Sequence, residues 1–428
     1  MKLRHILAVI LSLLIADTGY SQTYLSPRSI GYAQTYATQS RGADAIGWNP
    51  ANLGYEDNPG FSLSFGVLPF IPFPSVYLGN TSVSASWYDN NFRQGGMLDE
   101  AAKEEILSVF PEDGWRLDPQ IYLRLLGMSI GRTAIALDTQ VLNSVVLPKS
   151  IPELLLEGIQ FDDVVSLNEF HVESLSSATF SVAHGFPIHL PYVPEFSLGV
   201  GVKAIAGLAY AATDSFSGGL TTYRDRIVAD GNAIARYTLG GYGYAFDLGI
   251  SSRLTDRITG SLALNNLMGS ITWTDDYTQT HHYAFNLSTE VQDLYDSNLD
   301  SLMTNALTAD TSYASSGFTT PYPSYLVAGV QYDLLSRVRL FVNYKLGLSD
   351  LLISPTQPRI SFAGELRPLK WFPIRFGITN GNLNKFEWGA GFGLEFSHYS
   401  LLFGFSQTGG FFNSATGFSL AVGQELVF

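Results

Sequence analysis

The sequence predicts an all-β protein, a transmembrane antiparallel β-barrel of about 14 strands (up to 16) with an N-terminal segment inside its lumen. Three observations predict this class. Apolar and small residues alternate over long stretches, only 14 % of residues are charged while 13 % are aromatic and 41 are Gly, and the last strand ends on an aromatic residue. Such a barrel places its apolar residues in alternation, so its strands need no continuous apolar run.

The first 21 residues have the features of a signal peptide. Basic residues precede an apolar stretch from Ile6 to Ala16, which is too short to span a bilayer, and small residues at 19 and 21 form a cleavage site before Gln22. The alternative is a buried N-terminal helix. With residues 1–21 removed, no run of 18 apolar residues remains, so no transmembrane helix is expected.

Alternation defines the candidate strands. From Tyr242 to Ile250 the even positions are aromatic or aliphatic and the odd positions are Gly, Ala or Asp, and Phe386–Phe396 repeats the pattern. Runs of this kind have the length that a tilted strand needs to cross a bilayer. Sixteen runs lie near 60–67, 82–88, 120–131, 133–143, 173–186, 196–210, 233–252, 258–266, 278–288, 325–333, 338–347, 359–367, 372–380, 386–396, 398–407 and 414–428. Because two early runs can belong to a plug or to one broken strand, a count of 14 fits equally well.

Two segments between strands have helical spacing. Asp99 can cap a helix that Pro111 ends, within a segment near 97–111, and apolar residues recur at helical intervals near 290–308. The second helix falls in a long loop, Thr289–Ser324, on the extracellular side if the last strand ends in the periplasm. Either helix could bind a hydrophobic ligand at the barrel mouth, or simply pack on the rim or a neighbouring loop.

The chain ends in an alternating strand. Its apolar positions resemble the signal by which the outer-membrane insertion machinery recognises barrels, and they are Phe418, Leu420, Val422, Leu426 and Phe428. A soluble edge strand that ends by chance in Phe is the alternative. The resemblance implies a Gram-negative outer membrane, with membrane lipid and the insertion machinery as partners.

An N-terminal motif resembles a known family. The stretch Gly31–Ala37, followed by Gly42–Leu53 with its Asn-Pro-Ala core, resembles the hatch of the FadL/OMPP1/TodX outer-membrane transporters, and its central residues are Gly42, Asp44, Trp48, Asn49, Pro50 and Ala51. The same opening occurs in PorV-like barrels of type IX secretion. An uncharacterised Gram-negative outer-membrane barrel family is closer, because glycine patterns from Leu198 to Trp273 also match it. The resemblance implies a hatch over 22–59 and a barrel over 60–428.

Glycine and alanine in the hatch suit a crowded lumen, and the Gly-rich inner faces of the strands leave room for it. A cap on the periplasmic opening is the alternative placement. Strand parity puts several charges on the inner wall, where they could anchor the hatch, pair with one another or line a solute path. They are Lys203, Asp247, Arg339, Lys345, Glu365, Arg375, Glu387 and Glu395, with Asp333 and Glu425.

The composition excludes several chemistries. The chain has no Cys, so disulfides, thiolate metal sites and Cys nucleophiles are absent, and a net charge of −14 argues against a nucleic-acid partner. No His spacing indicates a metal site and no nucleophile motif selects catalytic residues, so neither an enzyme nor a cofactor is expected. Two functions remain: passage of hydrophobic or small solutes gated by the hatch, or a non-transporting scaffold that binds a secreted protein through its loops.

Overall fold

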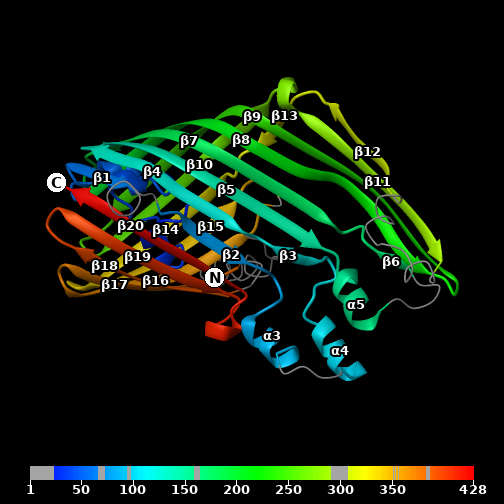
Figure 1. Cartoon of the computed structure of the whole chain (residues 1–428). Coiled ribbons are helices and arrows are strands. Elements are labelled where there is room, and N and C mark those ends of the chain that lie inside the picture. Colours follow the sequence, from blue (N-terminus) through cyan, green and yellow to red (C-terminus); the bar gives the residue numbers. More distant parts are fainter. Residues whose placement is uncertain are drawn as a thin grey trace, which may run out of the picture.

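The computed structural model describes residues 24–65, 73–93, 98–158, 164–290, 307–349, 351, 353–354, 356–381 and 386–428. The predicted signal peptide therefore lies outside the described residues. Most of the described residues form one antiparallel sheet that closes on itself (Figure 1), because the last strand pairs with the first. No described helix is long and apolar enough to cross a membrane, a finding that does not bear on strands.

The barrel has 14 strand positions, several of which are filled by consecutive short strands in line. In order around the wall they are β1 (Phe61–Phe65) with β2 (Ser75–Gly79), β3 (Trp115–Leu117) with β4 (Gln120–Ile130), β5 (Thr133–Leu147), β6 (Val164–Ser166) with β7 (His171–Pro187), β8 (Glu195–Thr222), β9 (Arg226–Arg253), β10 (Ile258–Trp273) with β11 (Gln279–Glu290), β12 (Leu307–Ala314) with β13 (Phe318–Pro321) and β14 (Tyr325–Leu335), β15 (Val338–Gly347), β16 (Pro358–Leu369), β17 (Phe372–Asn380), β18 (Phe386–Glu395), β19 (Tyr399–Thr408) and β20 (Gly417–Val427). The predicted count of 14 is confirmed.

The short turns that follow β4, β9, β14, β16 and β18 lie at one end of the barrel, together with the chain terminus at Phe428, and we call this end the base. The opposite, far end carries the longer connections and the three-residue turn between β8 and β9. The longer connections contain α3 (Ala85–Asn91), α4 (Glu100–Leu107), α5 (Ser150–Glu157) and the 3-10 turn η4 (Phe412–Ser414), whereas the 3-10 turn η3 (Asp275–Tyr277) lies between β10 and β11. Asp99 caps α4 by accepting a hydrogen bond from the Ala102 amide at 2.9 Å, so the predicted helix near 97–111 is confirmed.

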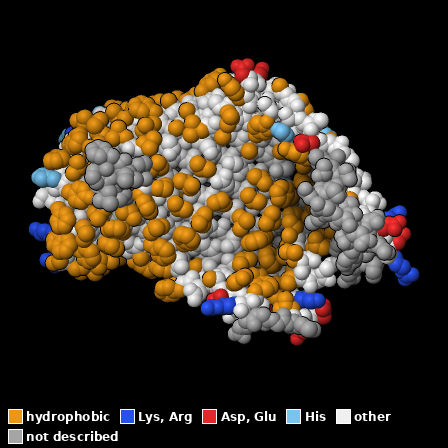
Figure 2. All heavy atoms as spheres, in the orientation of Figure 1, with side chains coloured by type: hydrophobic (Ala, Val, Ile, Leu, Met, Phe, Trp, Pro, Cys, Tyr) orange, Lys and Arg blue, Asp and Glu red, His pale blue; other side chains and the backbone are white. Residues whose placement is uncertain are grey.

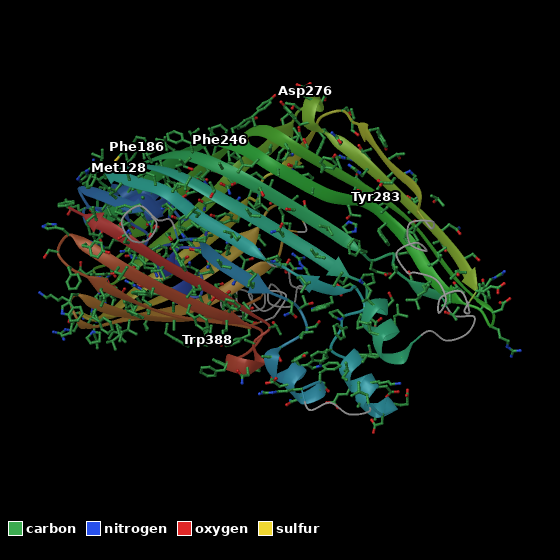
Figure 3. The ribbon with its side chains drawn as sticks, viewed as in Figure 1. Met128, Phe186, Phe246, Asp276, Tyr283 and Trp388 are labelled. Atoms are coloured by element: carbon green, nitrogen blue, oxygen red, sulfur yellow. The ribbon has the colours of Figure 1, made fainter. Side chains whose placement is uncertain are left out.

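Side-chain parity follows the sequence pattern. Tyr242, Tyr244 and Phe246 of β9 are exposed on the outer face, whereas Ala245 and Asp247, at the alternate positions, are buried in the lumen. Figure 2 shows hydrophobic side chains spread over much of the wall, and Phe246 lies on this outer surface in Figure 3. An outer face of this composition suits lipid rather than water.

Two local predictions were wrong, and a third lies mostly outside the described residues. The run near 82–88 is not a strand, because Ser84 accepts a hydrogen bond from the Trp87 amide and starts helix α3. The predicted loop over 289–324 contains strands β12 and β13. The helix near 290–308 falls mostly on residues outside the described part, and its two ends, Glu290 and Leu307, belong to strands.

The N-terminal segment forms a compact plug inside the barrel, made of α2 (Pro27–Gly31) and the 3-10 turns η1 (Gly42–Ala45) and η2 (Pro50–Gly54). We call residues 24–57 the hatch. Helix α2 packs on β17–β20, η1 on β1, β4 and β5, and η2 on β7–β9, so the hatch contacts the wall around its circumference. Most of its large side chains are buried, and Ile30 and Trp48 are only 0 % and 1 % exposed.

Candidate functional site: a lumenal hatch and its anchors

The hatch lies directly on the inner wall because the wall carries glycine where they meet. A Cβ atom on Gly199 or Gly249 would overlap the Asn49–Ala51 backbone or side chain. On the opposite wall, a Cβ on Gly377, Gly389 or Gly404 would overlap the backbone of α2 and the residues that follow it. The glycine-rich inner face therefore accommodates the hatch, and placement in the lumen, rather than as a cap, is what the structure has.

The Asn-Pro-Ala motif forms its own turn and binds the wall. Asn49 accepts a hydrogen bond from the Ala51 amide at 3.0 Å, which caps η2, and its Nδ2 donates to the Ile250 carbonyl of β9 at 3.1 Å. Pro50 stands at the first position of that turn, where a missing N–H costs nothing. Asn49 thus joins the local geometry of the hatch to a particular strand.

Asp44 is the centre of the hatch anchor. Its carboxylate is within 3.2–3.4 Å of Tyr24, Tyr36 and Arg28 of the hatch and of Arg124 on β4. Arg124 also pairs with Asp138 of β5 at 2.8 Å and donates to the Ala43 carbonyl. Because these groups are largely buried, each carboxylate depends on its guanidinium partners.

A second anchor fixes the other side of the hatch. Tyr32 donates to Glu365 at 2.7 Å and accepts from Arg375 at 3.2 Å, and Arg375 pairs with Glu395 at 2.5 Å. Arg28 reaches Glu425 of β20 at 2.7 Å. Cross-strand pairing places Asp333, Arg339, Glu365 and Arg375 in one row of alternating charge across β14–β17.

The remaining predicted charges have other positions. Lys203 pairs with Asp247 at 2.8 Å and donates to Asn266 at 2.6 Å, which holds an irregular part of β10 whose Asn265 bonds the Trp48 carbonyl. Lys345 lies 4.4 Å from the centre of the Tyr325 ring, and Tyr325 donates to the Gly47 carbonyl. These contacts connect both lysines indirectly to the hatch.

In the described part of the chain, Glu387, Arg339 and Asp333 form no hydrogen bond or ion pair with the hatch. Glu387 is 0 % exposed and pairs with Arg359 at 2.5 Å across the inner wall. Arg339 is half exposed at the base, 3.6 Å from Asp333. Arg339 is therefore a mouth residue rather than an enclosed lumenal one.

Sequence reasoning missed Arg28, Arg124 and Asp138. A bulge near Leu125 hides the parity of Arg124, because it leaves both Leu125 and Leu126 exposed and shifts the register with β5. An arginine within an apolar strand was nevertheless a usable signal, since such a charge needs a buried partner. Among the described residues, no group of three His, Asp or Glu side chains could hold a metal ion.

Three cavities adjoin the hatch. The largest, of about 440 Å³, lies at the base beside Tyr36 and Arg339. A second, of about 40 Å³, lies between the hatch residues Tyr24 and Ile46 and a ceiling at Tyr322, and its walls carry Lys203 and Asn266. Tyr322 also belongs to an apolar cluster with Trp273 and Ile353 that fills the lumen towards the far end. The lumen is thus occupied at two levels, by the hatch near the base and by this apolar cluster towards the far end.

The third cavity, of about 60 Å³, lies beside a part of β20 that no described residue of the first strand pairs with. β1 pairs with Gln424–Val427 of β20 and β2 with Gly417–Leu420, so no described residue of the first strand pairs with Ala421–Gly423. The cavity is lined by Phe65 and Phe73, where the described parts of the first strand end, by Leu402 and Val422 of the wall, and by the hatch at Tyr24–Arg28.

Fold and hatch together define a FadL-like β-barrel. Solved structures support this fold: the Ralstonia pickettii toluene transporter TbuX is 12 % identical over 94 % of this chain and 98 % of its own, with a TM-score of 0.50. The monoaromatic hydrocarbon channel CymD is 12 % identical over 94 % and 97 %, also at 0.50, and a deltaS2 mutant of the channel TodX is 10 % identical over 94 % and 97 %, at 0.50. Because the sequence identities are this low, the likeness to these structures establishes the fold alone.

The chain belongs to a family of unknown function (DUF5723), whose model matches residues 58–405. The match begins just after the hatch and covers most of the barrel. No curated protein matches the chain.

Proposed function

We propose that the protein is an outer-membrane barrel that passes small hydrophobic solutes sideways through its wall when the hatch moves. The cavity of about 60 Å³ carries this proposal, because it is lined on one side by the hatch and on the other by Phe65 and Phe73, where the described parts of the first strand end. Its wall side, formed by Phe65, Phe73, Leu402 and Val422, suits an apolar ligand, whereas its charged residues lie at the hatch and its anchors. The structural neighbours named as hydrocarbon channels agree with that substrate class.

The hatch gives the proposed path a gate. Its anchors are side-chain hydrogen bonds and ion pairs, which can break and reform without unfolding the wall, and Arg28, Asp44 and Arg124 line the same cavity. Displacement of residues 24–28 would connect the cavity to the lumen. The barrel wall, held by backbone pairing between strands, would remain intact.

The test is uptake of a labelled long-chain fatty acid, and separately of labelled toluene, into liposomes that contain the purified protein. Leu402→Trp should slow uptake at least tenfold, because Leu402 points into the cavity. Its matched control is Leu401→Trp, which places the same ring on the outer face one residue away. Equal uptake by the two variants would reject the sideways path.

A deletion variant without residues 22–56 tests whether the hatch gates the path. Faster uptake after this deletion supports gating by the hatch. If neither the intact nor the deleted protein takes up solute while both remain folded, the transport proposal fails and the scaffold function becomes the better one. That second function is favoured by one observation, the large sheet that extends beyond the far end of the barrel.

A further inference from the structure

One side of the barrel continues well past the other. β8 and β9 are 28 residues each; β6 pairs with the distal part of β8, β11 pairs with the distal part of β9, and β12 pairs with β11. We call the sheet made of β6, residues 211–222 of β8, residues 226–237 of β9, β11 and β12 the projecting sheet. In Figure 1 it extends away from the base, and Tyr283 of β11 lies on it in Figure 3.

The outermost strand of the projecting sheet, β12, is an open edge. It pairs on one side with β11, from Gln279 opposite Ala314 to Phe285 opposite Leu307. The next barrel strand, β15, ends at Gly347, opposite Tyr325, and so stops before reaching β12. No described strand pairs with the second side of β12, which leaves a row of backbone N–H and C=O groups unpaired by the sheet.

This edge lacks the protections that usually prevent strands from adding to a sheet. Natural edges are shortened, bulged, covered, or carry Pro or Lys. β12 has eight residues with no Pro or Lys, and its one charge is Asp310. Side chains from Asp310 to Ala314 are all exposed, and the one irregularity lies near its first residue.

A second copy of the chain does not fit this edge in a membrane. Antiparallel pairing of two identical strands requires a two-fold axis perpendicular to the sheet, and the projecting sheet continues the barrel wall. In the membrane orientation of the proposed function, that axis would lie in the membrane plane and would invert one barrel. This geometry excludes antiparallel pairing with a second copy, and we take a different polypeptide as the occupant.

Charge indicates what kind of segment fits. Within 213–240, 275–290 and 307–317, seven Asp and Glu residues stand against three Arg. One of these arginines, Arg236, is already paired with Asp214 at 2.7 Å. We propose that β12 is a docking edge that adds an extended, Lys- or Arg-bearing segment of another polypeptide as one more strand of the projecting sheet.

The probe is a labelled eight-residue peptide of alternating Thr and Lys, titrated into the purified full-length barrel at low salt and followed by fluorescence anisotropy. Saturable binding is expected, at least tenfold tighter than that of a matched peptide with Glu in place of Lys. A peptide with Pro at its centre should bind at least tenfold more weakly, because the proline has no backbone N–H to donate to the edge. Absence of saturable binding, or equal binding of all three peptides, would overturn the proposal.

Two adjacent substitutions locate the site. The N–H groups of successive strand residues point to opposite edges of the strand. One of the variants Thr311→Pro and Ser312→Pro therefore removes a donor on the open edge, and the other removes a donor that bonds to β11. The open-edge variant should keep a heat-modifiable barrel and lose at least tenfold in affinity for the Thr–Lys peptide. Wild-type affinity in both variants would reject β12 as the edge. Since this assay uses no solute, its result is independent of transport.

Discussion

The lumen is closed twice, by different chemistry. Near the base, the hatch is held by carboxylate–guanidinium contacts around Asp44 and Glu365 and by backbone seated on glycine. Towards the far end, the closure is an apolar cluster of Trp273, Tyr322 and Ile353. A buried ion pair becomes strongly destabilising when one partner is removed, whereas apolar packing loses stabilising free energy in proportion to the buried area that is lost. The two closures should therefore respond differently to substitution, salt and pH.

The largest expected effect is at the hatch anchor. Arg124→Met keeps the bulk of the side chain but leaves Asp44 and Asp138 short of a buried counter-charge, and should cost about 3–5 kcal/mol. The measurement is the unfolding free energy in lipid vesicles, together with trypsin cleavage in the hatch at Arg41. Arg236→Met is the control, because its partner Asp214 is about one-third exposed, and it should cost about 1 kcal/mol or less. Equal losses would contradict a dependence on burial.

A smaller loss is expected where the hatch meets the wall. Gly199→Val places a side chain against the Pro50–Ala51 backbone and should destabilise the protein by about 1–3 kcal/mol while exposing the hatch to trypsin. The matched variant Gly260→Val, whose Cβ would meet only Leu254 at 3.6 Å, should leave the hatch protected. If both behave alike, glycine in the wall does not position the hatch.

The same comparison explains what the sequence could predict. Where the wall has an apolar outer face and the hatch on its inner face, every second residue is apolar, so β9 from Tyr242 to Ile250 and the final strand were predictable. Farther from the base this alternation is lost, and residues 211–232 fell outside the predicted strands although all but the turn at 223–225 are strand. The hatch motif was predictable by resemblance, but its anchor Arg124 was hidden by a bulge.

A substitution in the apolar cluster near the far end should lower the unfolding free energy by an intermediate amount that does not depend on salt. Ile353 is 1 % exposed at the tip of the β15–β16 connection, and its amide donates to Glu173 at 3.2 Å. Ile353→Ala should cost about 2 kcal/mol, because a connection can relax more than a strand. The cost should be unchanged between 0.05 and roughly 0.5 M salt, the range over which surface charge interactions are screened. A salt-dependent cost would contradict an apolar closure.

The smallest effect expected is at the rim, where the hatch ends. Asp57 receives two hydrogen bonds from Arg41, at 2.7 and 3.2 Å, and lies 3.5 Å from Arg253 of β9. Burial alone would raise the pKa of the Asp57 carboxyl, but the two arginines outweigh it and the pKa is lowered. An acid whose folded-state pKa is lowered stabilises the fold above its unfolded pKa of about 3.9, and this contribution is lost as pH falls through the folded value.

Comparison of wild type with Asp57→Asn isolates this contribution. The difference in unfolding free energy should be under about 1 kcal/mol at neutral pH, since the Asp57 side chain is 54 % exposed and solvent screens its pairs. It should stay constant down to about pH 5 and shrink towards zero below about pH 4, and should also weaken with added salt. The buried pair of Arg124 and Asp138 should lose much less to salt, because solvent ions do not reach it. If this difference in unfolding free energy instead grows as pH falls, the folded state must favour the protonated form of Asp57. That result would contradict the proposal that Asp57 attaches the hatch to the rim through Arg41 and Arg253.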